Sequence, residues 1–140
     1  MEILKIKTKN RELGSYGERE AERLLRKKGF KTRKRGFVAL GHEIDLIAEN
    51  KEYLVFVEVK TRSAGRTDPR EPRPASAVGP EKQRSIIRAA KFYSATRGEG
   101  KKKRFDVIEV FVTQDERGKY QTDEIKHLES AFNYNTAYKL

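Results

Sequence analysis

Residues 43–60 read EIDLIAENKEYLVFVEVK, and this stretch decides the fold. Its second half, 53–60, is rich in valine and aromatic side chains, which predicts a β-strand. Apolar residues occupy both faces of that strand, so we expect it to be central and covered on both sides. Residues 43–48 predict a neighbouring strand, with the connecting turn at 49–52.

The register of these two strands brings charged residues together. Side chains on a strand alternate between faces, so Glu58 shares a face with Lys60, and Glu43 shares one with Asp45. A turn of two or four residues places Asp45 opposite Glu58. The same turn places Glu43 opposite Lys60. A loop of odd length would shift the register by one residue and break this cluster.

Two carboxylates on one partly apolar face need a compensating charge. Burying them is costly, and directly opposed carboxylates repel each other. A divalent cation removes both problems, because magnesium is usually held by one or two carboxylates together with phosphate oxygens and water. Asp45 and Glu58 are therefore candidate metal ligands. Lys60 would neutralise the scissile phosphate or orient the attacking water.

Two further carboxylates are candidates for the same cluster. Glu18 lies on the edge of the apolar stripe of a helix predicted over residues 12–29. A carboxylate turned toward the core needs a partner, so Glu18 is a candidate to complete or orient the ligands of the metal. Glu43 is either a further site residue or a structural partner of Lys60. For Glu58 and Lys60 themselves, the alternative is a surface ion pair at a strand end.

The remaining residues extend this pair of strands into an α/β domain. A short basic strand near a sheet edge precedes the pair, and a helix and two strands follow it. The predicted elements are a helix at 12–29, strands at 30–35, 43–48 and 53–60, a helix from Pro80 to Gly98, a strand at 105–112 and a weaker strand near Ile125. This order predicts a single domain over residues 1–140, with a mixed sheet and helices packed on it.

The composition favours a polyanionic partner. The 140 residues carry a net charge of +11 and have a pI near 9.9, which creates a long-range field that attracts polyanions. Nucleic acid is the expected partner, with DNA favoured over RNA, because phosphates neutralised by Lys or Arg release counterions. The chain has no cysteine, no signal-peptide pattern and no apolar segment long enough to span a bilayer. We therefore expect a cytoplasmic protein without membrane contact.

Basic residues cluster in two segments that we expect to hold the nucleic-acid backbone. One is a proline-rich loop at 61–79, where the concentration of arginine favours phosphate contact over a merely soluble loop. The other is the basic run before the strand at 105–112. Lys82 is a further candidate, with a solvated lysine as the alternative. Asp106 and His127 are interpreted as structural. The predicted contacts are Arg62, Arg66, Arg70, Arg73, Lys82, Lys101, Lys102, Lys103 and Arg104.

Four segments resemble the YraN-like family of small bacterial proteins. They are GSYGE at 14–18, EIDLIA at 43–48, VEVKTR at 57–62 and RFDV at 104–107, in this order along the chain. That family is similar to archaeal Holliday-junction resolvases and belongs with the restriction-endonuclease-like, or PD-(D/E)XK, fold. One departure is the long Arg/Pro loop, because the family usually has an aromatic-glycine pair after the Thr-Arg segment.

The resemblance implies both a site and an activity. It places the acidic motif of that superfamily on Asp45 and on Glu58-Val59-Lys60, and the helical acidic residue of the resolvases on Glu18. It implies a restriction-endonuclease-like mixed sheet flanked by helices, and a phosphodiesterase that depends on Mg²⁺ or Mn²⁺. Resolvases act as dimers, so a homodimer is an open alternative, although the sequence shows no dimer face.

These observations lead to one hypothesis and two alternatives. The hypothesis is a metal-dependent nuclease acting on DNA, with branched or flapped structures as candidate substrates. The first alternative is a non-catalytic nucleic-acid-binding module that keeps the nuclease fold. The second alternative, a ribosome- or RNA-associated protein, rests on charge alone.

Overall fold

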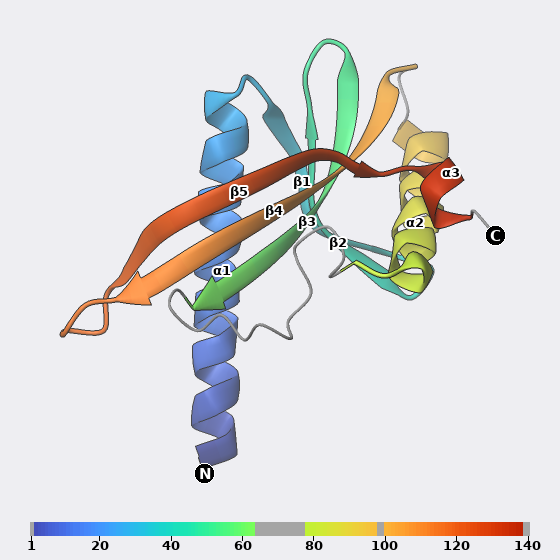
Figure 1. The fold of residues 1–140 in the computed structure, drawn as a ribbon. Coiled ribbons are helices and arrows are strands. Elements are labelled where there is room, and N and C mark those ends of the chain that lie inside the picture. The colour runs from blue at the N-terminus through green and yellow to red at the C-terminus, as the bar shows by residue number, and fades with distance from the viewer. Residues whose placement is uncertain (1, 64–77, 98–99, 139–140) are drawn as a thin grey trace.

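A five-stranded sheet with helices on both faces forms the body of the protein (Figure 1). The computed structural model describes residues 2–63, 78–97 and 100–138, with side chains from residue 11 onward. The elements are α1 (Glu2–Lys27), β1 (Lys31–Ala39), β2 (His42–Glu49), β3 (Tyr53–Ser63), α2 (Pro80–Arg97), β4 (Lys102–Gln114), β5 (Tyr120–Phe132) and α3 (Tyr134–Ala137). No described helix is both long and apolar enough to cross a membrane.

The sheet is mixed, as the sequence predicted. Its strand order is β1-β2-β3-β4-β5, and every neighbouring pair is antiparallel except β3 and β4, which are parallel. Parallel neighbours need a long crossover connection, and α2 lies within the connection between β3 and β4. This arrangement confirms the predicted α/β fold class and is consistent with a restriction-endonuclease-like fold.

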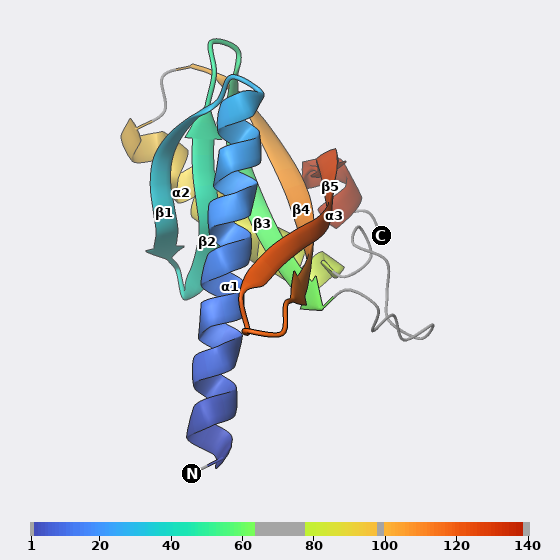
Figure 2. The same cartoon turned by 90° about the vertical axis from the view of Figure 1, so that its left-hand side faces the viewer.

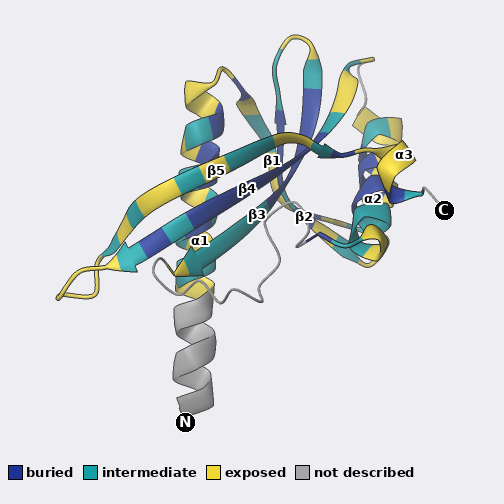
Figure 3. Cartoon of the chain, in the orientation of Figure 1, coloured by how far each residue is buried: buried dark blue, intermediate teal, exposed yellow. Residues whose placement is uncertain are grey.

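The helices α1 and α2 cover opposite faces of the sheet (Figure 2). On one face Leu25 of α1 belongs to the same buried cluster as Val55 and Val57 of β3. On the other face Ile87 of α2 belongs to the same cluster as Phe56. The middle strands β3 and β4 carry the longest runs of buried residues (Figure 3). The prediction of a central β3 that is covered on both sides is therefore confirmed.

Helix α1 approaches β3 closely at Gly17. A Cβ atom at this position would lie 2.8 Å from the Cβ of Thr61, which is too close for two carbon atoms. Only glycine therefore allows this approach without displacement of the strand. The approach places the next residue, Glu18, beside the part of β3 that carries Glu58 and Lys60.

Strand β1 is longer than its sequence pattern predicted. It ends at Ala39 rather than near residue 35, and it pairs with β2 up to its last residue. Leu40 and Gly41 connect the two strands with φ values of 53° and 75°. Two consecutive positive φ angles are typical of the tight hairpin turns that match the twist of antiparallel strands. The residues between the two predicted strands, 36–42, are therefore part of a continuous hairpin.

Strands β3 and β4 are also longer than predicted, because they pair with each other over almost their whole length. Their register begins with Tyr53 opposite Lys102. Residues 61–63, predicted as the start of a loop, are consequently part of β3. Residues 64–77, the rest of that loop, lie outside the described residues. The predicted weak strand, β5, spans 13 residues and pairs with β4.

Candidate active site

Strands β2 and β3 pair in the register that an even-length turn predicts. Their paired positions end at Leu46 opposite Val57. Beyond this point β2 stays paired with β1, and β3 stays paired with β4. Strands β2 and β3 therefore separate from each other. Asp45 and Glu58 are the next residues on each strand, and they lie where the separation begins.

Asp45 reaches across this separation to the backbone of β3. Its Oδ2 accepts a hydrogen bond of 2.8 Å from the N–H of Val59, which has lost its strand partner on this side. Burial and the negative charge of Glu58 outweigh this hydrogen bond and raise the pKa of Asp45 from 3.8 to about 7. The charges of Glu18 and Glu43 act in the same direction. The ionised form of Asp45 is therefore unfavourable, first because the side chain is buried and then because other carboxylates lie near it.

Glu58 is buried and contacts two lysines. Its side chain is 7% exposed, and its Oε1 lies 2.6 Å from Nζ of Lys82 and 3.4 Å from Nζ of Lys60. Burial alone lowers the pKa of Lys82, but the hydrogen bond and charge of Glu58 outweigh burial and hold that pKa above its ordinary value. Lys82 is therefore more than a solvated lysine: its side chain is 38% exposed, but α2 brings its ammonium to Glu58. Lys60 points the same way as Glu58, as the alternation of side chains predicted.

Glu18 approaches this cluster from α1, on the other face of the sheet. It lines a pocket of about 260 Å³ together with Lys60 and the two neighbours of Lys60 on β3. Burial, followed by the charges of Glu43 and Glu58, raises the pKa of Glu18 above its ordinary value. The predicted helical acid therefore belongs to the same electrostatic cluster as the acids on the strands.

Glu43 does not form the predicted pair with Lys60. At that level β2 and β3 have separated, and Glu43 is exposed and lies opposite Val38 of β1. Lys60 lies opposite Glu109 of β4 instead. The prediction was wrong because a register holds only as far as two strands remain hydrogen-bonded. Glu43 still adds negative charge to the cluster, since it raises the pKa of Asp45.

The described carboxylates do not form a complete set of ligands for a divalent cation. Within the described ranges, no three His, Cys, Asp or Glu side chains lie close enough together to hold one metal ion. Asp45 and Glu58 nevertheless supply oxygen donors on neighbouring strands, where burial and then the charge of Glu58 raise the pKa of Asp45. One or two carboxylates are what Mg²⁺ usually takes from a protein. We therefore treat Asp45 and Glu58 as the candidate ligands, with Glu18 beside them.

The predicted contacts of the proline-rich segment divide into two groups. Arg62 lies on β3, and its Nε donates a hydrogen bond of 2.6 Å to Glu109, whose side chain is 2% exposed. Its guanidinium therefore neutralises a buried carboxylate on β4, which is a structural task. Arg66, Arg70 and Arg73 lie outside the described residues.

The basic run at 101–104 lies at the far end of β3 from the candidate site. Lys103 is opposite Leu54, six positions before Lys60, which is roughly 20 Å along the strand. Two of its lysines form ion pairs, Lys101 with Glu49 at 2.7 Å and Lys102 with Glu52 at 3.3 Å. The run is therefore too far from Lys60 to contact the same phosphate.

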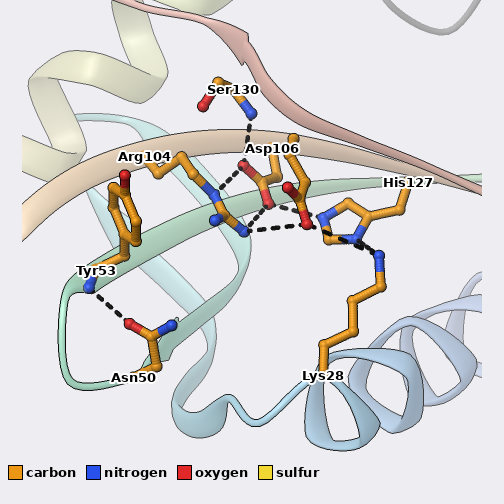
Figure 4. A network of polar contacts seen from close by, with 8 residues as sticks. Lys28, Asn50, Tyr53, Arg104, Asp106, His127 and Ser130 are labelled. Atoms are coloured by element: carbon orange, nitrogen blue, oxygen red, sulfur yellow. Dashed lines mark hydrogen bonds and ion pairs between the residues drawn. The ribbon is translucent and has the colours of Figure 1, made fainter.

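Arg104 belongs to a network of polar contacts at the start of β4 (Figure 4). It donates to both carboxylate oxygens of Asp106, at 3.0 and 2.9 Å, and its guanidinium lies over the rings of Phe30 and Tyr53. Burial alone raises the pKa of Asp106, but hydrogen bonds from His127 and Arg104 outweigh it and lower that pKa. The side chains of Asp106 and His127 are almost fully buried and contact each other at 2.7 Å, as expected for residues that hold the fold together.

The sequence patterns did not single out a further set of arginines beside the site. Helix α1 and strand β1 enclose a groove of about 460 Å³ that includes Glu18 in its lining. Its four arginines are Arg19, Arg23, Arg26 and Arg35. The spacing of the first three places them on one face of a helix, which the sequence could have indicated. Only the structure shows that Arg35 of β1 lies across from them.

Comparison with known proteins identifies the family. The chain matches the model of the "Uncharacterised protein family UPF0102" over residues 17–110, a range that includes every residue of the candidate site. A UPF0102 protein of Clostridium acetobutylicum is 38% identical over 126 residues, which are 88% of this chain and 95% of that protein. A UPF0102 protein of Caldanaerobacter subterraneus is 37% identical over 127 residues, which are 90% of this chain and 98% of that protein. A UPF0102 protein of Syntrophotalea carbinolica is 40% identical over 125 residues, which are 86% of this chain and 91% of that protein. The chain therefore belongs to the UPF0102 family, the YraN-like family that its four sequence segments indicated.

Proposed function

We propose that this protein is a metal-dependent nuclease that hydrolyses phosphodiester bonds in DNA. The observation that supports this proposal is the juxtaposition of Asp45 and Glu58 where β2 and β3 separate, with two lysines on Glu58. Hydrolysis of a phosphodiester needs carboxylates for a divalent cation and positive charge for the phosphate oxygens. This small cluster contains both kinds of group.

Each side chain has a distinct role in this proposal. Asp45 and Glu58 would hold Mg²⁺ or Mn²⁺, which when bound polarises a phosphoryl oxygen and lowers the pKa of a water molecule. Lys60 is 27% exposed, so its ammonium can reach a phosphate at the surface and stabilise the charge that develops on it. Glu18 would orient the polar groups around the cation from the α1 side.

The proposed substrate is DNA, and branched or flapped DNA is the candidate subclass. The net charge of +11 supports a polyanionic substrate. The resemblance to Holliday-junction resolvases is what suggests branched forms. Because phosphate contacts position a nucleic acid without reading its sequence, we expect cleavage to depend on the shape of the substrate more than on its sequence.

A cleavage panel tests the proposal. Labelled single-stranded, duplex, flap and four-way DNA are incubated with wild type, Asp45→Asn and Lys60→Ala, in Mg²⁺, Mn²⁺ or EDTA. We expect wild type to cleave with metal and both variants to be inactive. Calorimetric titration should show weaker metal binding by Asp45→Asn but unchanged binding by Lys60→Ala, because lysine is not a ligand. A wild type that binds neither metal, even with DNA present, would refute the proposal.

One observation favours a second candidate function, a non-catalytic nucleic-acid-binding module. Lys82 neutralises the buried Glu58 through a 2.6 Å contact, so the protein itself satisfies this carboxylate. A module of this kind would bind DNA but cleave none of the substrates with either metal. Asp45→Asn should then bind DNA at least as tightly as wild type, because one repulsive negative charge is gone. The same panel therefore separates the two functions.

A further inference from the structure

We infer that the groove between α1 and β1 binds the backbone of double-stranded DNA and leads it to the candidate active site. We call it the arginine groove, after Arg19, Arg23, Arg26 and Arg35 in its lining. The inference rests on the proposed function for the identity of the polyanion, and it names the surface and the form of DNA that the proposed function leaves open.

The arginines lie on both walls of the groove. Arg19, Arg23 and Arg26 follow one another along α1 at spacings of four and three residues, so they share one helix face about one turn, or 5.4 Å, apart. Arg35 lies on β1, the other wall. A phosphate chain between the walls would therefore meet cations from two directions.

Glu22 organises two of these arginines. Arg35 donates to it through Nε and Nη2, both at 2.7 Å, and Arg26 donates to the same carboxylate. The Glu22 side chain is 6% exposed, whereas those of Arg26 and Arg35 are 63% and 68% exposed. A guanidinium has five N–H donors, so each arginine keeps donors for a phosphate while Glu22 holds it in place.

The other two arginines, Arg19 and Arg23, make few polar contacts. Arg19 is exposed, and it makes no hydrogen bond or ion pair within the part of the chain that the structure describes. Arg23 is 70% exposed, and its ion pair with Glu20 spans 3.6 Å. An exposed pair of this kind is worth little, so a phosphate can replace it. Arg19 and Arg23 are therefore the residues best placed to exchange counterions for DNA.

The arginine groove is continuous with the candidate active site. Glu18 lines both the groove and the adjoining pocket that contains Lys60. At the other end, Arg26 and Arg35 also line a hollow that contains Lys31. A backbone lying in the groove would therefore run from Lys31 past the arginines to Lys60.

The chemistry of the lining favours duplex DNA over single strands. Among the described residues that line it, none is aromatic, and the one large apolar residue, Leu46, is 2% exposed. Proteins that hold single strands rely on aromatic rings that stack against the bases. A groove of arginines without such rings recognises charge, and duplex DNA releases more counterions for each contact than a single strand does. We therefore expect duplex binding that is independent of sequence.

Fluorescence anisotropy with a labelled duplex in EDTA tests the groove separately from cleavage. The variant is Arg19→Gln with Arg23→Gln, which removes two exposed charges. We expect weaker binding on duplexes of different sequence alike. The slope of log affinity against log salt concentration should fall by about 2, at roughly 0.9 for each lost phosphate contact. A single strand of the same length should bind more weakly than the duplex.

The matched control is Arg88→Gln with Arg97→Gln, which removes the same charge from exposed positions on α2. We expect this control to bind like wild type, and circular dichroism verifies that both variants are folded.

Equal losses of affinity in the two variants, or no loss in the groove variant, would overturn the inference that the arginine groove binds DNA but leave the nuclease proposal intact. Equal affinity for single strands would overturn the duplex assignment, and preference for anionic phospholipid vesicles would overturn DNA as the ligand. A groove variant that loses binding while wild type cleaves nothing supports the groove and refutes only the nuclease.

Discussion

Replacing Asp45 with Asn should stabilise the folded protein at alkaline pH and have less effect as the pH falls. Asparagine keeps an oxygen that can accept the 2.8 Å hydrogen bond from the N–H of Val59. It removes the negative charge that burial and the neighbouring Glu58 make unfavourable. The substitution thus isolates the cost of holding a carboxylate at this position.

The size of this effect follows from the pKa of Asp45. Its value is about 7 in the folded protein and 3.8 ordinarily. The folded state therefore holds the proton more tightly than the unfolded state, so wild type has its full stability below pH 4 and loses stability as the pH rises to about 7. At about 1.36 kcal/mol for each pH unit, the total loss is about 4 kcal/mol. About 3 kcal/mol of it falls between pH 5 and pH 9.

Urea unfolding of wild type and Asp45→Asn at pH 5, 7 and 9, in EDTA, measures the difference in unfolding free energy. The difference should grow in favour of the variant by about 3 kcal/mol between pH 5 and pH 9. Mg²⁺ or Mn²⁺ at pH 8 should stabilise wild type but not the variant.

Glu49, on the same strand, provides the control. The hydrogen bond from Lys101, together with that from Arg33, lowers the pKa of Glu49, so its contribution to stability is present above pH 4.5 and is lost only in acid. Glu49→Gln should therefore show nearly the same deficit at pH 7 and pH 9. An Asp45→Asn difference that does not change with pH would show that burial and the neighbouring carboxylates do not raise the pKa of Asp45 in the folded protein.

Two further substitutions test other contacts. Lys82→Met should raise the affinity for Mg²⁺ or Mn²⁺ in calorimetric titration, because it removes the ammonium that lies 2.6 Å from Oε1 of Glu58; unchanged affinity would show that Lys82 does not compete with the cation. Gly17→Ala should lower the unfolding free energy by about 1–3 kcal/mol, since its Cβ would lie 2.8 Å from that of Thr61. Gly14→Ala, with nothing within 4 Å, should be neutral or slightly stabilising, and equal denaturant midpoints for the two variants would contradict the close packing at Gly17.

The sequence by itself determined the strand pair at the centre of the fold. The alternation of side chains depends on consecutive residues, so the register with Leu46 opposite Val57 could be predicted for a turn with an even number of residues. The positions of Asp45 and Glu58 follow from that register by one further step. The proximity of Asp45 and Glu58 is therefore determined within residues 43–60, without help from distant parts of the chain.

Several contacts were decided by the tertiary structure alone. Glu43 lies apart from Lys60 because β2 follows β1 while β3 follows β4. Lys82 reaches Glu58 because the crossover returns α2 to this end of the sheet. In both cases the partner is chosen by the path of whole elements, which no short pattern in the sequence encodes.

For the nucleic-acid-binding surface, too, the sequence predicted one part and the tertiary structure decided the other. Composition alone predicted a polyanionic partner, because net charge does not depend on the fold. It could not say which basic residues act together. The parallel register of β3 and β4 carries the run at 101–104 away from the site, and the packing of α1 beside β1 brings Arg35 to the arginines of α1. A local pattern sets the face on which a side chain lies, whereas strand pairing and helix packing over long sequence separations decide which faces meet.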